Sequence, residues 1–260
     1  MDYCKKVVPI TGASSGIGRA VALALSPHNN KITVTARRQA LLEETAEMVR
    51  RNGSECLPIT GDALDGTHAD DVVKEVIKRY GRIDIAILNI GAGPPSNTLT
   101  ATRESILHCM RINYESMINF FCPLIRQMKN QDSRCMIAHT NSLATYFGIP
   151  MQGDYAAAKV AARIFLETAR MELKHFGYNH IVIQTIHPGF VDTDASRNDG
   201  IPAPNQISEE KAAEYVLKGI KKEMRENLFP PATKWATKLG KVVPHWHLTR
   251  VLLSQTPKAY

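Results

Sequence analysis

The sequence predicts an α/β fold in which a doubly wound parallel sheet of about seven strands is flanked by helices on both faces. Short apolar runs rich in β-branched residues alternate with helix-length segments over most of the 260 residues. No stretch rich in Pro, Gly or Ser divides the chain, and it has no internal repeat. We therefore expect a single domain over residues 1–260, with right-handed crossovers between its strands.

The expected elements follow one another as repeated βαβ units require. Strands are predicted at Lys6–Thr11, Lys31–Ala36, Cys56–Thr60, Ile83–Asn89, Arg134–Thr140 and His180–His187, with a weaker one at Asn227–Phe229. Helices are predicted at Gly16–Leu25, Gln39–Arg51, His68–Tyr80, Arg103–Lys129, Tyr155–Phe176 and Ser208–Met224. The last helix has Ser208 as a good N-cap. Two irregular stretches, Ala92–Thr98 and Asp194–Ile207, follow strands, so they should lie at the sheet edge where such folds bind ligands.

Composition narrows the class of protein. A hydrophobic content of 44% and a charged content of 22% are typical of globular proteins. The five cysteines are scattered without a CxxC pair or a Cys/His spacing, which indicates reduced thiols, no disulfide framework and no metal site. The start of the chain lacks the pattern of a signal peptide, and the chain has no run of 18 apolar residues. We expect a cytoplasmic protein without a transmembrane segment.

The net charge of +7 is concentrated near the C-terminus. Residues Lys211–Tyr260 contain ten Lys or Arg and three Glu, so the remaining 210 residues are neutral overall. Nucleic-acid binding needs a basic surface on the body of the fold. No nucleic-acid partner is therefore expected.

The turn after the first predicted strand is rich in glycine and reads TGASSGIG over Thr11–Gly18. Its glycines permit a tight turn, close approach of the backbone to a pyrophosphate, and close packing of the next helix. The N-terminus of that helix directs free N–H groups at the phosphates. The GxxxGxG spacing differs from the commoner GxGxxG fingerprint, and a glycine-rich turn can also be ordinary loop chemistry. Its position between a strand and a helix favours a dinucleotide site in a Rossmann-type fold.

The end of the second strand bears on the choice of cofactor. It reads Thr35-Ala36-Arg37-Arg38, without the carboxylate that would bind a ribose 2′-hydroxyl. A guanidinium is suited to a 2′-phosphate, so we expect NADP(H), with Arg37 as the main ligand and Arg38 as the second. The alternative is that both arginines only begin a solvated helix.

A candidate catalytic pair opens the helix at Tyr155. Tyr155 and Lys159 are four residues apart, so they share one helix face, and the ammonium is expected to lower the phenol pKa from about 10. A YxxxK pair alone is weak evidence. Ser142 follows the preceding strand, where its hydroxyl is placed to polarise a carbonyl. Asn113 is a polar residue in an apolar stretch of a predicted helix, and the alternative is that a backbone carbonyl satisfies it.

Together these motifs resemble the classical short-chain dehydrogenase/reductase family, over about residues 5 to 195. The resemblance rests on the glycine turn Thr11–Gly18, Asp62, Asn89, Asn113, Ser142, the Tyr155/Lys159 pair and the PGxxxT motif Pro188–Thr193. It implies an oxidoreductase that moves a hydride between nicotinamide and a carbonyl or secondary alcohol. In that reaction Tyr155 is the general acid/base, Lys159 holds the nicotinamide ribose, Ser142 orients the substrate oxygen, and Asn113 anchors a water-linked proton relay.

The resemblance also implies a set of cofactor contacts. Asp62 and Ala63 should flank the adenine, and Val191 and Thr193 should contact the carboxamide and a nearby phosphate. The full set is Gly12, Ser14, Ser15, Gly16, Ile17, Gly18, Arg37, Arg38, Asp62, Ala63, Asn89, Gly91, Tyr155, Lys159, Pro188, Gly189, Val191 and Thr193.

The chain departs from the family pattern at two places. The family's NNAG after the fourth strand reads Asn89-Ile90-Gly91-Ala92, which weakens the case for Asn89 and Gly91 as cofactor contacts. Ser15 stands where many NADP-preferring members have a basic residue, which leaves Arg37 as the main phosphate ligand.

The C-terminal segment 230–260 is predicted to be a basic amphipathic extension of the same domain. Trp235, Leu239, Val242 and Trp246 recur at helical spacing, with Pro244 interrupting the pattern. Three interpretations stay open for this segment: a lid over an apolar substrate, a subunit contact, or contact with an anionic membrane surface. A lid or subunit contact is preferred, because Pro244 limits a continuous interfacial helix. The chain lacks the glycine-rich terminal strand of many tetrameric relatives, so we expect a homodimer through the two long helices.

Two functions compete with catalysis. One is a non-catalytic nucleotide-binding regulator on the same fold, which would normally have lost Tyr155 or Lys159. The other is a peripheral membrane-associated or scaffold protein built on the basic extension. The substrate itself is expected to be a small-molecule carbonyl or alcohol, with an apolar molecule as one option, and its specificity should reside in Gly93–Thr98, Leu143–Met151, Asp194–Ile207 and the extension.

Overall fold

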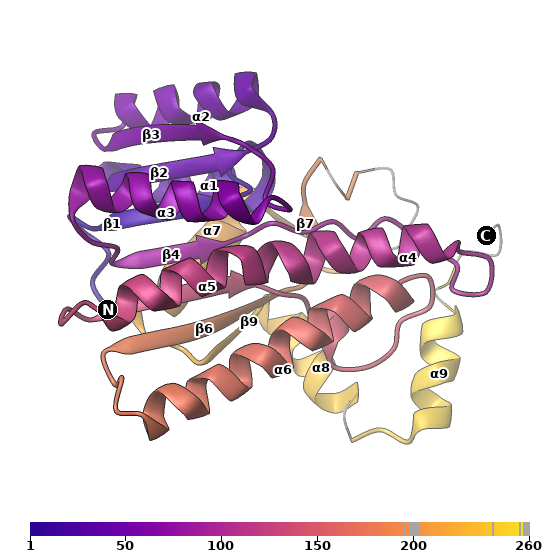
Figure 1. Ribbon diagram of the computed structural model, residues 1–260. Coiled ribbons are helices and arrows are strands. Elements are labelled where there is room, and N and C mark those ends of the chain that lie inside the picture. The colour runs from indigo at the N-terminus through magenta and orange to yellow at the C-terminus, as the bar shows by residue number, and fades with distance from the viewer. Residues whose placement is uncertain (195, 198–202, 241, 255, 257–260) are drawn as a thin grey trace.

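Seven parallel strands form the central sheet, in the order β3-β2-β1-β4-β5-β6-β9 (Figure 1). They are β1 (Val7–Thr11), β2 (Lys31–Ala36), β3 (Glu55–Thr60), β4 (Ile85–Leu88), β5 (Cys135–Thr140), β6 (Ile181–Pro188) and β9 (Glu226–Phe229). The computed structural model describes residues 1–194, 196–197, 203–240, 242–254 and 256. The strand order reverses between β1 and β4, as in a doubly wound sheet, and the predicted fold class is confirmed.

Helices cover both faces of the sheet (Figure 1). They are α1 (Gly16–Leu25), α2 (Gln39–Arg51), α3 (Gly66–Tyr80), α4 (Arg103–Met110), α5 (Ser116–Lys129), α6 (Gly153–His175), α7 (Glu209–Lys221), α8 (Pro231–Gly240) and α9 (His245–Ser254). Side chains of α1, α2 and α7 pack in one core, and those of α3, α5 and α6 in the other. Strands β1 and β5 are buried at every residue, which explains why their sequences are continuous apolar runs instead of alternating ones.

The predicted long helix Arg103–Lys129 is interrupted. A π-helical turn, Arg111–Glu115, separates α4 from α5 and places Asn113 in its middle. The turn inserts one extra residue without breaking the apolar spacing on either side, so periodicity alone could not show it. Two further strands of two residues each, β7 (Val191–Asp192) and β8 (Ile207–Ser208), pair in parallel beyond the main sheet. The predicted cap is present, because the Ser208 hydroxyl accepts from Lys211 N at the start of α7.

The C-terminal segment forms two separate helices, α8 and α9. Trp235, Leu239, Val242 and Trp246 are divided between α8, the following turn and α9, because α8 ends at Gly240 and α9 begins only after Pro244, where the interruption was predicted. The expected extension 230–260 is described up to residue 256 except at 241 and 255, so Lys241 and residues 257–260 lie outside the described part. Residues 195 and 198–202 of the predicted Asp194–Ile207 stretch lie outside it as well. Within the described residues, no helix has both the length and the apolar character needed to cross a bilayer.

Candidate active site

The carboxyl ends of the strands open into a cleft of about 760 Å³. The cleft brings together residues that are far apart in the sequence, including both glycine motifs and the proposed catalytic side chains. Of the residues predicted to form the site, those lining the cleft are Gly12, Ser14, Ser15, Gly16, Ile17, Arg37, Arg38, Asp62, Ala63, Asn89, Gly91, Ser142, Tyr155, Lys159, Pro188, Gly189, Val191 and Thr193. Gly18 and Asn113 are not on its wall, and each supports residues that are.

The glycine turn at the end of β1 is shaped as a phosphate site requires. Gly12 and Gly16 have φ angles of +65° and +60°, in the left-handed region that favours glycine. A Cβ atom on Gly18 would lie 2.3 Å from the Gly12 carbonyl oxygen, so a side chain there would push α1 off the turn. Gly18 therefore acts through close packing, which explains its place behind the cleft wall.

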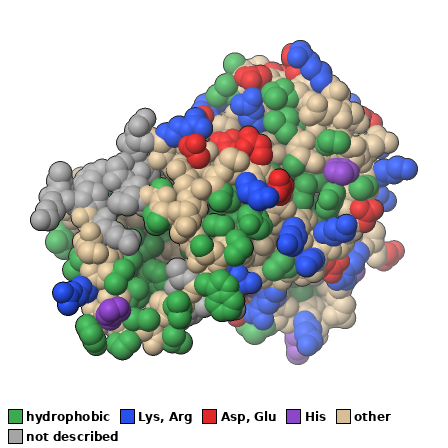
Figure 2. Space-filling model, turned by 180° about the vertical axis from the view of Figure 1, so that it is seen from behind, with side chains coloured by type: hydrophobic (Ala, Val, Ile, Leu, Met, Phe, Trp, Pro, Cys, Tyr) green, Lys and Arg blue, Asp and Glu red, His purple; other side chains and the backbone are tan. Residues whose placement is uncertain are grey.

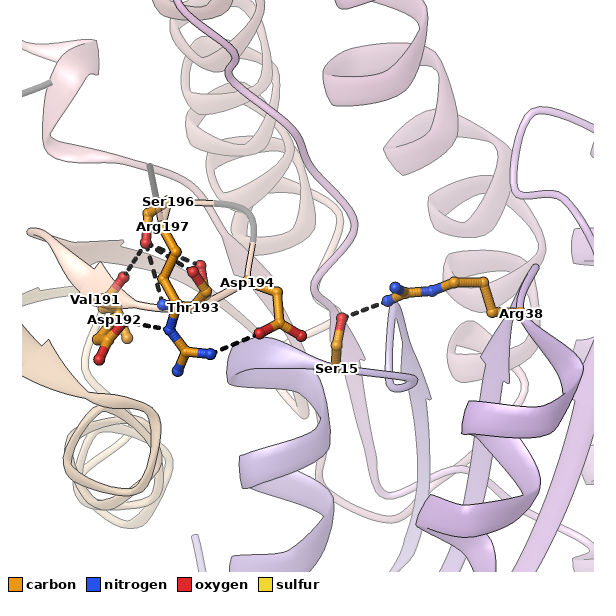
Figure 3. A network of polar contacts seen from close by, with 8 residues as sticks. All are labelled: Ser15, Arg38, Val191, Asp192, Thr193, Asp194, Ser196 and Arg197. Carbon is orange, nitrogen blue, oxygen red and sulfur yellow. Dashed lines mark hydrogen bonds and ion pairs between the residues drawn. The ribbon is translucent and has the colours of Figure 1, made fainter. Parts of the chain in front are cut away.

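The first turn of α1 keeps its N–H groups free of side-chain caps. Ser15 is the N-cap residue, but its hydroxyl makes no capping bond and instead accepts from the Arg38 guanidinium at 2.5 Å (Figure 3). Arg38 also donates to the Ser14 hydroxyl at 3.1 Å. The helix dipole and the uncapped N–H groups thus face the cleft beside a guanidinium, an arrangement suited to phosphate groups.

These contacts bear on the two arginines after β2. Both Arg37 and Arg38 are exposed and line the cleft. The hydrogen bonds to the glycine turn come from Arg38, whereas the sequence argument favoured Arg37. The division of roles between them stays a prediction, which we revise in favour of Arg38.

The opposite wall of the phosphate region comes from the segment after β6. Thr193 faces the glycine turn, since a Cβ atom on Gly16 would lie 3.5 Å from the Thr193 methyl carbon. Arg197 holds this segment by ion pairs of 2.8 Å to both Asp192 and Asp194 (Figure 3). The guanidinium thereby offsets one of the two negative charges that would otherwise repel an anionic ligand beside the turn.

Asp62 and Ala63 form the far end of the cleft, after β3. The Asp62 carboxylate accepts from Leu64 N at 3.0 Å, and Ala63 is buried with its carbonyl held by Asn119 at 2.9 Å. Both residues are therefore fixed at the cleft wall. Their place, beyond the end of β2 that carries Arg38, is consistent with the adenine contacts implied by the resemblance.

Lys159 is buried at the centre of the site. Its Nζ atom donates to the Thr140 carbonyl at 3.1 Å and lies 5.7 Å from the centre of the Tyr155 ring. Burial lowers the pKa of Lys159 to about 8, because desolvation disfavours the ammonium. A Cβ atom on Gly91 would come within 2.8 Å of this Nζ atom, so the residue after Ile90 must be small.

Tyr155 does not behave as the sequence argument expected. Burial raises its pKa above the ordinary value of 10, with Ser142 acting in the opposite direction through a side-chain hydrogen bond. The expected lowering by the Lys159 ammonium is outweighed, because the phenolate would have to form in a desolvated site. Tyr155 is therefore a protonated phenol at neutral pH in the protein alone.

Three hydrogen bonds hold Ser142 in place. Its hydroxyl accepts from Ala144 N at 3.1 Å, and its carbonyl accepts from the Thr145 hydroxyl at 2.9 Å. The His187 ring, through Nδ1, bonds the same carbonyl at 3.0 Å. These contacts fix the serine at the cleft wall next to Tyr155.

Asn113 is fully buried in the π-helical turn and joins it to the loop after β4. Its side chain donates to the Ala92 carbonyl at 2.7 Å and accepts from Ala92 N at 3.2 Å. It also donates to the Cys109 carbonyl at 3.0 Å, as the backbone-carbonyl alternative anticipated. Asn113 therefore positions the Gly91–Ala92 backbone beside Lys159, while its proposed relay role is untested.

Sequence reasoning missed several residues of the site. His187 is fully buried at the end of β6, its ring centre lies 5.2 Å from that of Tyr146 with the two planes tilted by 40°, and burial lowers its pKa to about 4. His139 of β5 is also buried, and burial lowers its pKa well below the ordinary value. A polar ring at the end of an otherwise apolar strand was the available signal. Gly93, expected only as the start of a specificity segment, packs on Tyr155, because a Cβ atom there would lie 2.8 Å from the Tyr155 ring.

The substrate end of the cleft is apolar. Leu143, Phe147, Ile149, Pro150, Met151, Leu248, Val251 and Leu252 line it. The last three belong to α9, so part of the C-terminal extension covers this end, as a lid would. Thr233 of α8 also lines the cleft, and its buried hydroxyl has no partner among the described residues.

The site fits a dinucleotide better than a metal ion. A phosphorylated, hydrogen-bonding ligand would use several features of the cleft. These are the close-packed glycines, the uncapped helix N–H groups, the guanidinium at one end and the Thr233 hydroxyl, which has no partner among the described residues. Within the described part of the chain, no group of three or more His, Cys, Asp or Glu side chains is placed to hold a metal ion. The five cysteines, all of them described, are unpaired.

Comparison with known proteins agrees with this geometry. The sequence profile of short chain dehydrogenases matches residues 6–201. An uncharacterised oxidoreductase of Listeria monocytogenes is 33% identical over 194 residues, which cover 75% of this chain and 77% of that protein. A 3-ketodihydrosphingosine reductase of Bacteroides thetaiotaomicron is 28% identical over 227 residues, covering 86% of this chain and 79% of the relative.

Two solved structures are similar in fold. A short chain dehydrogenase/reductase from Burkholderia phymatum, in complex with NAD, superposes with a TM-score of 0.85 at 20% identity, over 100% of this chain and 99% of that one. An alcohol dehydrogenase from Thermococcus sibiricus, complexed with 5-hydroxy-NADP, gives a TM-score of 0.75 at 24% identity, over 86% and 94% of the two chains. At these identities the likeness establishes the arrangement of the sheet and helices.

Proposed function

The chain belongs to the short chain dehydrogenase family of oxidoreductases, and from this premise we propose that it is an NADP(H)-dependent carbonyl reductase. The observation that carries the proposal is the meeting of Tyr155, Ser142 and Lys159 on one cleft with the glycine turn of β1. These residues come from segments far apart in the sequence. A chance surface would not bring a proton donor, a hydroxyl and a buried ammonium to one phosphate-binding edge.

The proposed cofactor is NADP(H). The glycine turn and the N-terminus of α1 would hold the pyrophosphate, and Lys159 the nicotinamide ribose. Arg38, and to a lesser extent Arg37, would bind the 2′-phosphate, because the end of β2 offers guanidinium groups and no carboxylate. When bound, the nicotinamide supplies the hydride for reduction or accepts it in the reverse direction.

The proton is proposed to come from Tyr155. Because burial keeps the phenol protonated at neutral pH, Tyr155 is ready to donate to the oxygen of a carbonyl substrate. Ser142 would orient that oxygen by hydrogen bonding. The Lys159 ammonium stabilises the phenolate left after transfer, and Asn113 keeps the Gly91–Ala92 backbone in place beside it. A protonated Tyr155 is the form that reduction of a carbonyl requires.

An apolar substrate fits the cleft best. Its substrate end is walled by aliphatic and aromatic side chains from the loop 143–151 and from α9. The similar protein from Bacteroides thetaiotaomicron is named a 3-ketodihydrosphingosine reductase, and a relative from Sesamum indicum, 32% identical over 205 residues, is named an 11-beta-hydroxysteroid dehydrogenase. Both names refer to large apolar molecules, which supports a ketone or alcohol of this kind here.

A non-catalytic regulator on the same fold is the less favoured function. It would not need the burial of Lys159, which disfavours the ammonium and lowers its pKa to about 8. We also propose a cytoplasmic homodimer through the two long helical segments, α4–α5 and α6, which carry the exposed apolar side chains Leu107, Ile164 and Met171.

A substrate panel tests the proposal. Ketones, 3-oxoacyl thioesters, steroids and sugars are assayed with NADPH and with NADH, following absorbance of the reduced cofactor. The proposal expects turnover of at least one apolar ketone with NADPH, and weaker activity with NADH. Tight NADPH binding without turnover of any apolar ketone would instead favour the regulator.

A further inference from the structure

The two C-terminal helices carry an unusually exposed apolar surface. Trp235 and Leu239 of α8, Val242 in the connecting turn, and Trp246 and Leu253 of α9 are each more than half exposed, and we call this set the outer face. In the space-filling view, hydrophobic side chains gather at the lower left, on the end of the molecule that carries α9, beside basic and His side chains (Figure 2). Single exposed apolar residues are common, but five on two consecutive helices and the turn between them, with both tryptophans of the chain among them, mark a candidate interaction surface.

Helix α9 is apolar on two opposite sides. Leu248 and Leu252 on its inner side line the catalytic cleft, while Trp246 and Leu253 on the other side are 69% and 57% exposed. An apolar side of a helix normally packs against an apolar environment, in a protein core, a partner or a membrane. Packing on its own subunit explains only the inner side of α9, so the outer side needs a second environment.

The charge of the segment identifies that environment. Residues 230–260 contain five Lys or Arg and no Asp or Glu. Lys234 and Arg250 place two of these cations on the same two helices as the outer face. In a twofold contact with a second copy the face would meet itself and oppose like charges, whereas an anionic bilayer complements both its charge and its tryptophans.

A second groove lies beside the cleft. It has a volume of about 610 Å³ and shares Phe147, Ile149 and Leu252 with the wall of the cleft. Leu253, a residue of the outer face, also lines this groove. The groove therefore adjoins the cleft wall and includes a residue from the exposed side of α9.

We propose that the outer face of α8 and α9 docks on an anionic membrane surface, with the groove opening toward the bilayer. Trp235, Val242 and Trp246 insert at the level of the lipid headgroups, and Lys234 and Arg250 contact anionic lipid. The protein lies on the membrane without spanning it. This docking depends on the surface alone and holds whether or not the proposed reaction is correct.

Vesicle co-sedimentation tests the docking with the full-length protein. Vesicles of phosphatidylcholine alone are compared with vesicles containing 30% phosphatidylglycerol. We expect binding to the anionic vesicles to be at least about tenfold tighter, to weaken at 0.5 M salt, and to shift tryptophan emission to shorter wavelength. Equal binding to both vesicle types, or no binding to either at low salt, overturns the proposal.

A matched pair of variants locates the contact. Trp246→Ser removes a ring that is 69% exposed and lies edge-on to His247, whereas Phe176→Ser removes a ring that is 68% exposed and lies edge-on to His175, at the far end of α6. Trp246→Ser should weaken binding to anionic vesicles at least about fivefold, and Phe176→Ser should leave it unchanged. Arg250→Gln should weaken it and reduce its salt dependence.

Folding controls and two further results complete the test of the docking. Thermal melting of each variant, expected within about 2 °C of the parent, shows that the fold is intact. Equal loss with Trp246→Ser and Phe176→Ser overturns the proposal. A dimer contact through the outer face also overturns it. That outcome would be seen as a parent protein that sediments as a dimer and does not bind vesicles, together with a Trp246→Ser variant that sediments as a monomer.

Discussion

The Nζ atom of Lys159 lies 5.7 Å from the centre of the Tyr155 ring, one turn away along α6, and its hydrogen bond goes to the Thr140 carbonyl. Neither side chain is in an environment that favours its charged form. Burial lowers the pKa of Lys159 to about 8 and raises that of Tyr155. The protein therefore holds a protonated phenol and a destabilised ammonium side by side, which suits proton donation but reduces stability.

Replacing Lys159 with Met should stabilise the protein while abolishing turnover. The folded pKa of about 8 is below the unfolded value of 10.5. The whole energetic penalty of burying the ammonium is therefore present below about pH 8. This penalty is relieved as pH rises from 8 toward 10.5. At pH 7 we expect the free energy of unfolding of Lys159→Met to exceed that of the parent by on the order of 3 kcal/mol.

Urea unfolding of the cofactor-free proteins at pH 7 and pH 9.5 measures this effect. The gap between parent and variant should shrink to about 1 kcal/mol at pH 9.5. Arg79→Met, which removes a cation at the exposed end of α3, serves as the control and should show no comparable dependence on pH. A Lys159→Met protein less stable than the parent at pH 7 would show that the ammonium is not destabilised by burial.

Arg38→Ala should remove most of the preference for NADP(H). Arg38 bonds both serines of the glycine turn, so its guanidinium is fixed at the end of the cleft. We expect NADPH to bind at least about tenfold tighter than NADH in the parent, which corresponds to about 1.4 kcal/mol. Dissociation constants for both cofactors, measured by fluorescence, should become similar in Arg38→Ala.

The neighbouring arginine provides the comparison for that experiment. Arg37→Ala removes an equal charge from the next position and should reduce the preference less than Arg38→Ala does. The reverse order would restore Arg37 as the main phosphate ligand. Equal affinity of the parent for both cofactors would contradict the choice of NADP(H) altogether.

His187→Asn should make the protein more resistant to acid. The folded pKa of His187, about 4, is below the unfolded value of 6.5, so its neutral ring contributes stability above pH 6.5 that is lost as pH falls toward 4. An Asn side chain has an N–H donor for the Ser142 carbonyl and does not titrate. Between pH 7 and pH 4 the variant should lose about 2 kcal/mol less stability than the parent.

Chemical denaturation at several pH values, with a buffer series between 4 and 7, checks this prediction. His175→Asn is the control, because His175 lies at the C-terminal end of α6 and far from Ser142. Parallel loss of stability in the parent and in His187→Asn would mean that His187 is protonated in the folded protein.

The parts of the site that depend on local spacing were predictable from the sequence. Tyr155 and Lys159 are one helical turn apart, so their shared face follows from α-helical geometry. The glycine turn follows from the short segment between β1 and α1, where backbone constraints leave few alternatives. The doubly wound parallel sheet followed from the alternation of elements and the handedness of crossovers, while the order of its strands is known only from the structure.

The parts that depend on contacts between distant segments were not predictable. His187 reaches Ser142 across 45 residues, through a strand pairing whose register no local pattern specifies. The π-helical turn at Asn113 adds one residue to a turn of the helix, and the spacing of apolar residues does not reveal this insertion. The raised pKa of Tyr155 reflects burial by the loop at Gly93, whereas the local spacing suggested only the nearby ammonium.

The most direct test of the central claim is the turnover of Tyr155→Phe with NADPH and an apolar ketone accepted by the parent. The ring and its packing on Gly93 remain, so NADPH should bind within about threefold of the parent. The proton donor is lost, so turnover should fall by about 100-fold or more. Turnover near that of the parent, with cofactor binding intact, would contradict the assignment of Tyr155 as the proton donor.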